Sequence, residues 1–127
     1  TTALAQPSLR LEVGGQQFGG FASLVQDREA GGTVTLEQGW ISDAFLGLWW
    51  PELGKDLAPG PHRFPAECVG RRVEVTQALA PGNARGRLRS WTLIDACPIA
   101  CEVDARDGEK SSVTSLTLRV GGVGAAM

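Results

Sequence analysis

Residues that carry catalytic or metal chemistry are scarce in this chain. Its 127 residues include one histidine, His62, and three cysteines. A structural metal site usually takes four such ligands, and no Ser/His/Asp or Cys/His set has the spacing of a nucleophilic site. The glycines that follow Val120 lead into no helix, so they do not make a phosphate loop. We therefore expect no enzyme activity, no catalytic residue, no metal and no cofactor, and we interpret His62 as a surface or hydrogen-bonding residue.

The odd number of cysteines argues against a full disulfide framework. Cys97 and Cys101 lie four positions apart, which is about 13 Å along an extended strand and too far for a direct bridge. We expect reduced, structural thiols in a chain that is made in a reducing cytoplasm.

Long apolar runs and a strong net charge are also missing. No run approaches the roughly 20 apolar residues that span a bilayer, and no basic region precedes an apolar one at the N-terminus, so we expect neither membrane insertion nor a signal peptide. The formal net charge of -2 gives no general attraction to nucleic acid or to anionic membranes.

The chain is rich in turn residues and in alternating patterns. Its 17 glycines, 7 prolines and hydrophobic content of 43% predict one mostly-β domain over residues 1–127. Residues 1–7 read as an extended arm, and residues 121–127 carry too little side chain to hold structure alone, which predicts a flexible tail. Residues 54–65 read as a loop and residues 66–69 as a short strand.

Alternation of apolar and polar residues predicts strands with one buried face. The clearest segment is residues 89–102, where Trp91 and Leu93 alternate with polar residues before Pro98, at which the ladder should break or bend at an edge or a bulge. A further strand at residues 115–120 completes a meander that closes a small antiparallel β-barrel or sandwich. Similar patterns are centred on Leu9 and Leu11, on Val34 and Leu36, and on Val73 and Val75.

One segment has helical spacing instead. Apolar residues at 41, 44, 45, 48 and 49 predict one short α-helix over about residues 42–50, with Ser42 or Asp43 as N-cap and Pro51 as its end. Such a helix would plug one end or side of the barrel. The paired tryptophans fit core packing or a subunit interface. The expected core residues are Phe45, Leu48, Trp49, Trp91 and Leu93.

Arginines are concentrated in one predicted hairpin, at positions 71, 72, 85, 87 and 89. They fit a basic patch or a solvated edge that guards against stray strand pairing.

Five fragments, in the same order along the chain, resemble the tube proteins of contractile phage tails. Val34-Thr-Leu-Glu-Gln-Gly39 followed by Ser42-Asp-Ala-Phe-Leu-Gly-Leu-Trp-Trp50 resembles that family's Ile-Thr-Leu-Lys-Arg-Gly strand and the short helix after it. Arg89-Ser-Trp91-Thr-Leu-Ile-Asp-Ala96-Cys-Pro98 is similar to its Arg-Trp-X-X-X-X-Ala-X-Pro corner, with Ser90 inserted. Phe18-Gly-Gly-Phe21 resembles its Gly-Gly-Phe-Ser, and Arg28-Glu29-Ala30-Gly31-Gly32 its Arg-Glu-Gly-Gly. Residues 113–122 match its last strand and terminal glycine.

The resemblance implies a ring-forming β-barrel with one helix. Hexameric rings of such subunits stack into a tube inside a sheath, as in phage tails, tailocins and extracellular injection systems, and the tube of type VI secretion has a similar fold. The implied partners are further copies of the chain, sheath and baseplate proteins, and DNA or protein cargo that passes without specific binding. The implied location is a virion tail or phage-like particle assembled in the bacterial cytoplasm.

The interface residues that we expect lie on the terminal strands and on one hairpin tip. The strands around residues 9–25 and 113–120 should pair between subunits, and the charged tip should contact the next ring. The residues are Leu9, Leu11, Leu116, Leu118, Asp27, Arg28 and Glu29.

The chain also departs from the family pattern. Val25 runs almost directly to Arg28, and Gly32 runs directly to Thr33, where the family has a longer hairpin and a Gly-rich link. A specialised ring at the baseplate or tail end is therefore an alternative to a repeating tube subunit. A soluble β-barrel module that binds a ligand with its tryptophan cluster is a further alternative.

Overall fold

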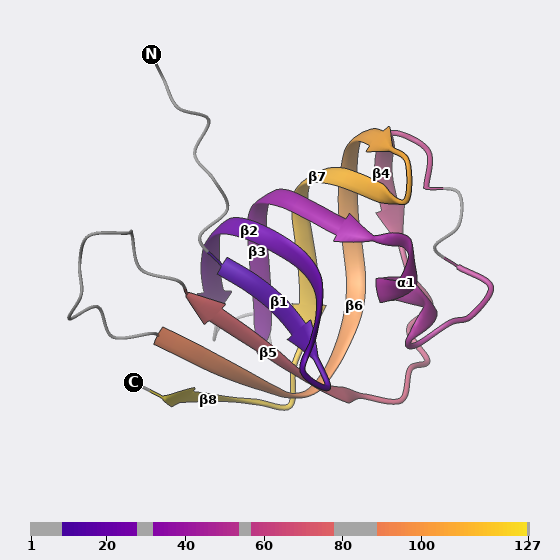
Figure 1. Cartoon of the computed structure of the whole chain (residues 1–127). Helices are drawn as coiled ribbons and strands as arrows, with labels where there is room; N and C mark the ends of the chain where they lie inside the picture. The colour runs from indigo at the N-terminus through magenta and orange to yellow at the C-terminus, as the bar shows by residue number, and fades with distance from the viewer. Residues whose placement is uncertain (1–8, 28–31, 54–56, 78–88, 127) are drawn as a thin grey trace, which may run out of the picture.

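Eight antiparallel strands and one short helix make up the described part of the chain (Figure 1). The structure, a computed structural model, describes residues 9–27, 32–53, 57–77 and 89–126. In chain order the elements are β1 (Leu9–Val13), β2 (Gln16–Asp27), β3 (Thr33–Ser42), α1 (Asp43–Gly47), β4 (Gly60–Arg63), β5 (Arg71–Gln77), β6 (Arg89–Asp107), β7 (Lys110–Arg119) and β8 (Gly122–Ala126).

The sheet curls into a near-closed ring. Its strand order is β4-β6-β5-β1-β2-β3-β7, and β7 pairs back with β6, so the ring runs from β6 through β5, β1, β2, β3 and β7 and returns to β6. Two strands lie off this ring, because β4 and β8 pair only with β6 among the described strands. The predicted mostly-β fold with one short helix is confirmed.

The long strand β6 closes the ring by pairing differently along its two halves. Its first half pairs with β5 and β8, and its second half pairs with β7 and β4. Pro98 does not end the strand, because residues 89–107 form one continuous element. The predicted irregularity appears instead as a register shift between Pro98 and Ala100, beside Asp95 with its positive φ of 56°. The strand, corner and strand that we expected are therefore one bent strand.

The core fills the inside of the ring. Successive side chains of a strand point to opposite faces of the sheet, so those at every second position point into the core. Phe45 and Leu93 are fully buried, as is Phe21. Leu48, Trp49 and Trp91, which we also expected in the core, are half-buried and pack against its margin. The other fully buried large side chains are Leu11, Leu36, Ile41, Leu46, Leu116, Leu118, Val34, Val73 and Val75.

Helix α1 lies at one end of the ring (Figure 1) and is shorter than the predicted segment over residues 42–50. Ser42 has extended backbone and makes no capping hydrogen bond with its side chain. The N–H of Asp43 donates to the Glu109 carbonyl at 2.9 Å, and Arg106 Nη1 donates to Asp43 Oδ1 at 2.9 Å. The start of the helix is thus held by the turn between β6 and β7.

Three local predictions are wrong. The region expected to be a loop contains β4, and residues 66–69 form no strand. The segment expected to be a flexible tail contains β8, which pairs with β6 from Gly122 to Ala126. Side-chain content did not decide this, because the tail is held by backbone hydrogen bonds to a strand that is distant in sequence.

The paired strands β2 and β3 leave no space for a side chain at Gly39. A Cβ added at Gly39 would lie 1.9 Å from the Gly20 carbonyl oxygen and 2.6 Å from the Phe21 ring. Phe21 is opposite Gly39 in the ladder, so its ring covers the glycine and occupies the space that a side chain would need.

Gly39→Ala should therefore destabilise the fold by about 3 kcal/mol or more, because backbone atoms must move to admit the methyl group. Gly47→Ala is the matched control, since a Cβ there meets nothing within 4 Å, and alanine is favoured over glycine in a helix. Urea unfolding of the two variants and the parent measures both effects. A Gly39→Ala variant as stable as the parent would show that the two strands do not approach this closely.

Candidate functional site

Two of the strands predicted to pair between subunits, β1 and β7, have no free edge. β1 lies between β2 and β5, and β7 lies between β3 and β6. The side chains of Leu9, Leu11, Leu116 and Leu118 are buried in the core of the same chain. The prediction that these leucines form a subunit interface is wrong, because alternation identifies a buried face without saying which neighbours occupy the strand's edges.

The predicted charged tip lies where β2 ends. Asp27 is the last residue of β2, is exposed, and pairs with Thr33 across the hairpin. Arg28 and Glu29 lie outside the described residues. Within the described residues, β2 and β3 are paired as far as Asp27 and Thr33.

Free edges occur at three other places in the described part of the chain. β4 and β8 each pair on one side only, with β6. Among the described strands, residues 22–26 of β2 pair only with β3, since β1 pairs with β2 no further than Phe21. A free edge exposes a row of backbone N–H and C=O groups to which another strand can add.

The edge of β4 is blunted. The Phe64 N–H donates to the Ile99 carbonyl at 3.0 Å, so alternation turns the backbone nitrogens of Pro61 and Arg63 outward. Pro61 has no N–H to offer, and Arg63 is a charged residue on the same short edge. Both are devices that discourage the addition of a strand.

The edge of β8 lacks such protection. Its sequence Gly-Val-Gly-Ala-Ala contains no proline and no charged residue. Gly124 is exposed, and a Cβ there would touch only the Thr92 Cβ, at 3.9 Å; at Gly122 it would touch nothing within 4 Å. The strand therefore presents a nearly bare backbone.

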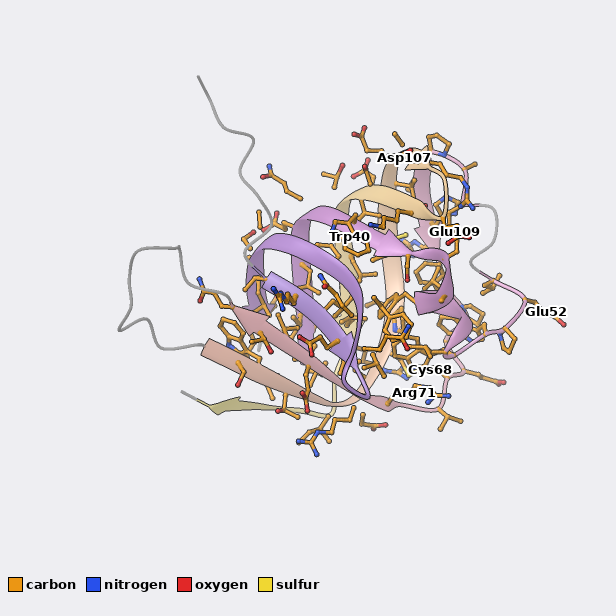
Figure 2. All side chains as sticks on the ribbon, viewed as in Figure 1. Trp40, Glu52, Cys68, Arg71, Asp107 and Glu109 are labelled. Atoms are coloured by element: carbon orange, nitrogen blue, oxygen red, sulfur yellow. A yellow bond between two sulfur atoms is a disulfide. The ribbon has the colours of Figure 1, made fainter. Side chains whose placement is uncertain are left out.

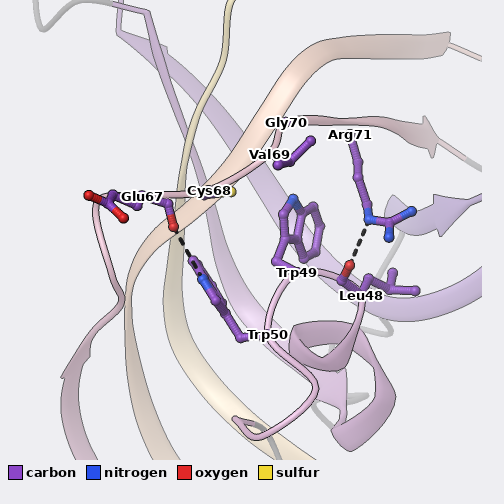
Figure 3. A pocket seen from close by; sticks show the side chains of 8 residues that line it. All are labelled: Leu48, Trp49, Trp50, Glu67, Cys68, Val69, Gly70 and Arg71. Atoms are coloured by element: carbon purple, nitrogen blue, oxygen red, sulfur yellow. Dashed lines mark hydrogen bonds between the residues drawn. The ribbon is translucent and has the colours of Figure 1, made fainter.

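A second surface feature lies where the chain leaves α1 and meets residues 67–71. A pocket of about 600 Å³ lies there, lined by Trp49, Trp50, Val69 and Arg71 among others (Figure 3). The Trp49 indole N–H donates to the Ala96 carbonyl at 2.9 Å. The Trp50 indole N–H donates to the Glu67 carbonyl at 3.4 Å, and Arg71 Nε donates to the Leu48 carbonyl at 2.7 Å. Both tryptophan donors are thus used within the chain.

A disulfide between Cys68 and Cys97 fastens the same corner to β6. The prediction of reduced thiols is wrong for these two cysteines, since it compared only the pair that lies close in sequence, and folding brings Cys68 to within 6.2 Å of Cys97 between Cα atoms. Cys101 is free and buried, and burial raises the pKa of its thiol from 9.0 to about 11. Figure 2 shows Cys68 and Arg71 at one corner, away from Asp107 and Glu109 at the turn between β6 and β7.

The arginine-rich hairpin is described only in part. Arg71 belongs to the corner, and Arg72 lies 3.5 Å from the Glu74 carboxylate on the same strand. Positions 85 and 87 lie outside the described residues. His62 Nε2 is 2.6 Å from the Ala58 carbonyl oxygen, a contact within its own segment.

The described residues contain no group of three or more His, Cys, Asp or Glu side chains placed to hold a metal ion. No helix among them has the length and apolar character needed to cross a membrane.

No protein-family model, curated protein sequence or solved structure matches the chain. The free edges and the disulfide-bonded corner are therefore interpreted on their own geometry.

The Cys68→Ala, Cys97→Ala double variant should lose about 3–4 kcal/mol of stability, because the bond joins residues 29 positions apart and restricts the unfolded chain. Urea unfolding with and without dithiothreitol measures this. The reductant should lower the stability of the parent to about that of the double variant and leave the double variant unchanged. The stabilising role of the bond would be contradicted if the parent had the same stability with and without dithiothreitol and that stability equalled the stability of the double variant.

Proposed function

We propose that this protein is a structural subunit of the inner tube of a contractile phage tail or phage-like injection particle. The observation that carries the proposal is a near-closed ring of strands, with one short helix, that keeps an unprotected strand edge outside the ring. This is the architecture that the five resembling fragments imply. A domain that has a complete core of its own and one unpaired strand edge can bind further copies of itself without unfolding.

In this role the protein works through its surface and needs no cofactor, metal or catalytic group. Copies join side by side into hexameric rings, and rings stack inside a sheath above a baseplate. The net charge of -2 suits a lumen that lets DNA or protein cargo pass without adhesion. The Cys68–Cys97 disulfide fits a particle that leaves the reducing cytoplasm in which it is assembled.

A specialised ring at the baseplate or tail end is the closest alternative. The length of the β2–β3 hairpin favours it, because the two strands pair as far as Asp27 and Thr33 and only residues 28–32 connect them. A short connection leaves little chain to reach towards an adjacent ring. A specialised ring would form hexamers that stack poorly.

A ligand-binding module is a candidate from a different class. The pocket beside Trp49 and Trp50 supports it, and an apolar groove of about 410 Å³ lies next to it, along Pro51, Leu53 and Pro65. Against it, both indole N–H groups already bond to backbone carbonyls of the chain. A ligand would have to bind without hydrogen bonds from the two indoles, which are among the groups that could fix its orientation.

The purified protein should form hexamers or larger assemblies at micromolar concentration, because the proposed tube is built from rings of six copies. Size-exclusion chromatography with light scattering measures the mass directly. Dilution should return monomers that keep the fold, since the ring of strands closes within one chain. A clean monomer at every concentration would reject both tube proposals and favour the ligand-binding module.

A further inference from the structure

The edge of β8 needs a partner more than any other edge in the described part of the chain. A long, flat, uncharged edge is an aggregation hazard that proteins normally cover or blunt. This chain blunts β4 with Pro61 and Arg63, yet it leaves five residues of β8 with every backbone N–H present. Ile94, opposite Gly122 in the ladder, is 53% exposed beside this edge.

A second edge of the same length is open among the described strands. Residues 22–26 of β2 contain no proline and no charged residue, and they pair with β3 alone among the described strands. Leu24 is half-buried and Val25 is 50% exposed. This edge carries Leu24 and Val25, whereas β8 consists of glycine and alanine apart from Val123.

We propose that β8 of one copy pairs with residues 22–26 of β2 in the next copy. The proposal rests on the proposed function and names the contact that joins subunits within a ring. The two edges match in length, at five residues each. The small side chains of β8 leave room for Leu24 and Val25, so apolar surface is buried while the backbone groups pair.

The two edges belong to different parts of the molecule, so the contact is heterologous. Each copy then offers one β8 edge and one β2 edge, and addition continues until a ring closes or a filament grows. Pairing of β8 with β8 would instead use one patch on both copies and would stop at a dimer. The symmetry of the product therefore distinguishes the two arrangements.

Lysine at the β8 edge is the first test. Gly122→Lys and Gly124→Lys add a charge where the chain has space for a side chain, and we expect each to reduce the assembled fraction by about tenfold while monomer stability is retained. Thr114→Lys is the matched control, because it adds the same charge at an exposed position of β7, whose two edges are both paired. Light scattering measures assembly, and circular dichroism checks the fold.

Cysteine cross-linking is the second test and reports the partner strand. Cys101 is buried and the other two cysteines are bonded, so an introduced thiol is the reactive one. Gly124→Cys mixed with Ser23→Cys, Leu24→Cys or Val25→Cys should give cross-linked mixed pairs under mild oxidation. Gly124→Cys alone should not cross-link.

Each result separates the contact from the function. Rings that persist in both lysine variants, or Gly124→Cys that cross-links to itself, would overturn the β8–β2 contact while the ring-forming function stands. A parent protein that is monomeric throughout would overturn both.

Discussion

Ring closure through β6 is the constraint on which the rest of the structure depends. One strand of 19 residues must pair with β5 along its first half and with β7 along its second half, and each half also carries one strand on its other side. This requires the strand to bend, and the bend lies between the positive φ of Asp95 and the register shift at Pro98. Without the bend the sheet would remain open, and the leucines inside it would face water.

The corner beside α1 holds this bend in place. Trp49 donates to Ala96, Cys97 is bonded to Cys68, and a Cβ at Gly70 would lie 1.8 Å from the Asp95 carboxylate, so the segment before β5 packs directly against the bent part of β6. We interpret the tryptophans and the disulfide chiefly as supports of the barrel. The pocket between them follows from that packing, and the surface available for assembly is on the strand edges.

The sequence predicted the strands and the helix that are determined by the local pattern of apolar and polar residues. Alternation identified the strands around Leu9, Val34, Val73 and Leu93, and helical spacing identified the short helix with Phe45 in the core. It could not identify β4 or β8, because a Pro-rich and a Gly-rich segment become strands only through pairing with β6. Nor could it show that Leu116 is held by neighbours on both edges, or that Cys68 meets Cys97, because both facts depend on contacts distant in sequence.

We propose a self-contained barrel that assembles through an edge outside its ring, and in a stack of such rings the few residues between Asp27 and Thr33 would leave little chain to reach an adjacent ring. Electron microscopy of the purified protein at assembling concentration tests this account most directly. Class averages should show closed rings with sixfold symmetry and an open centre, either single or in short stacks. Particles that are uniformly the size of one chain, or dimers with a twofold axis and no central opening, would contradict it.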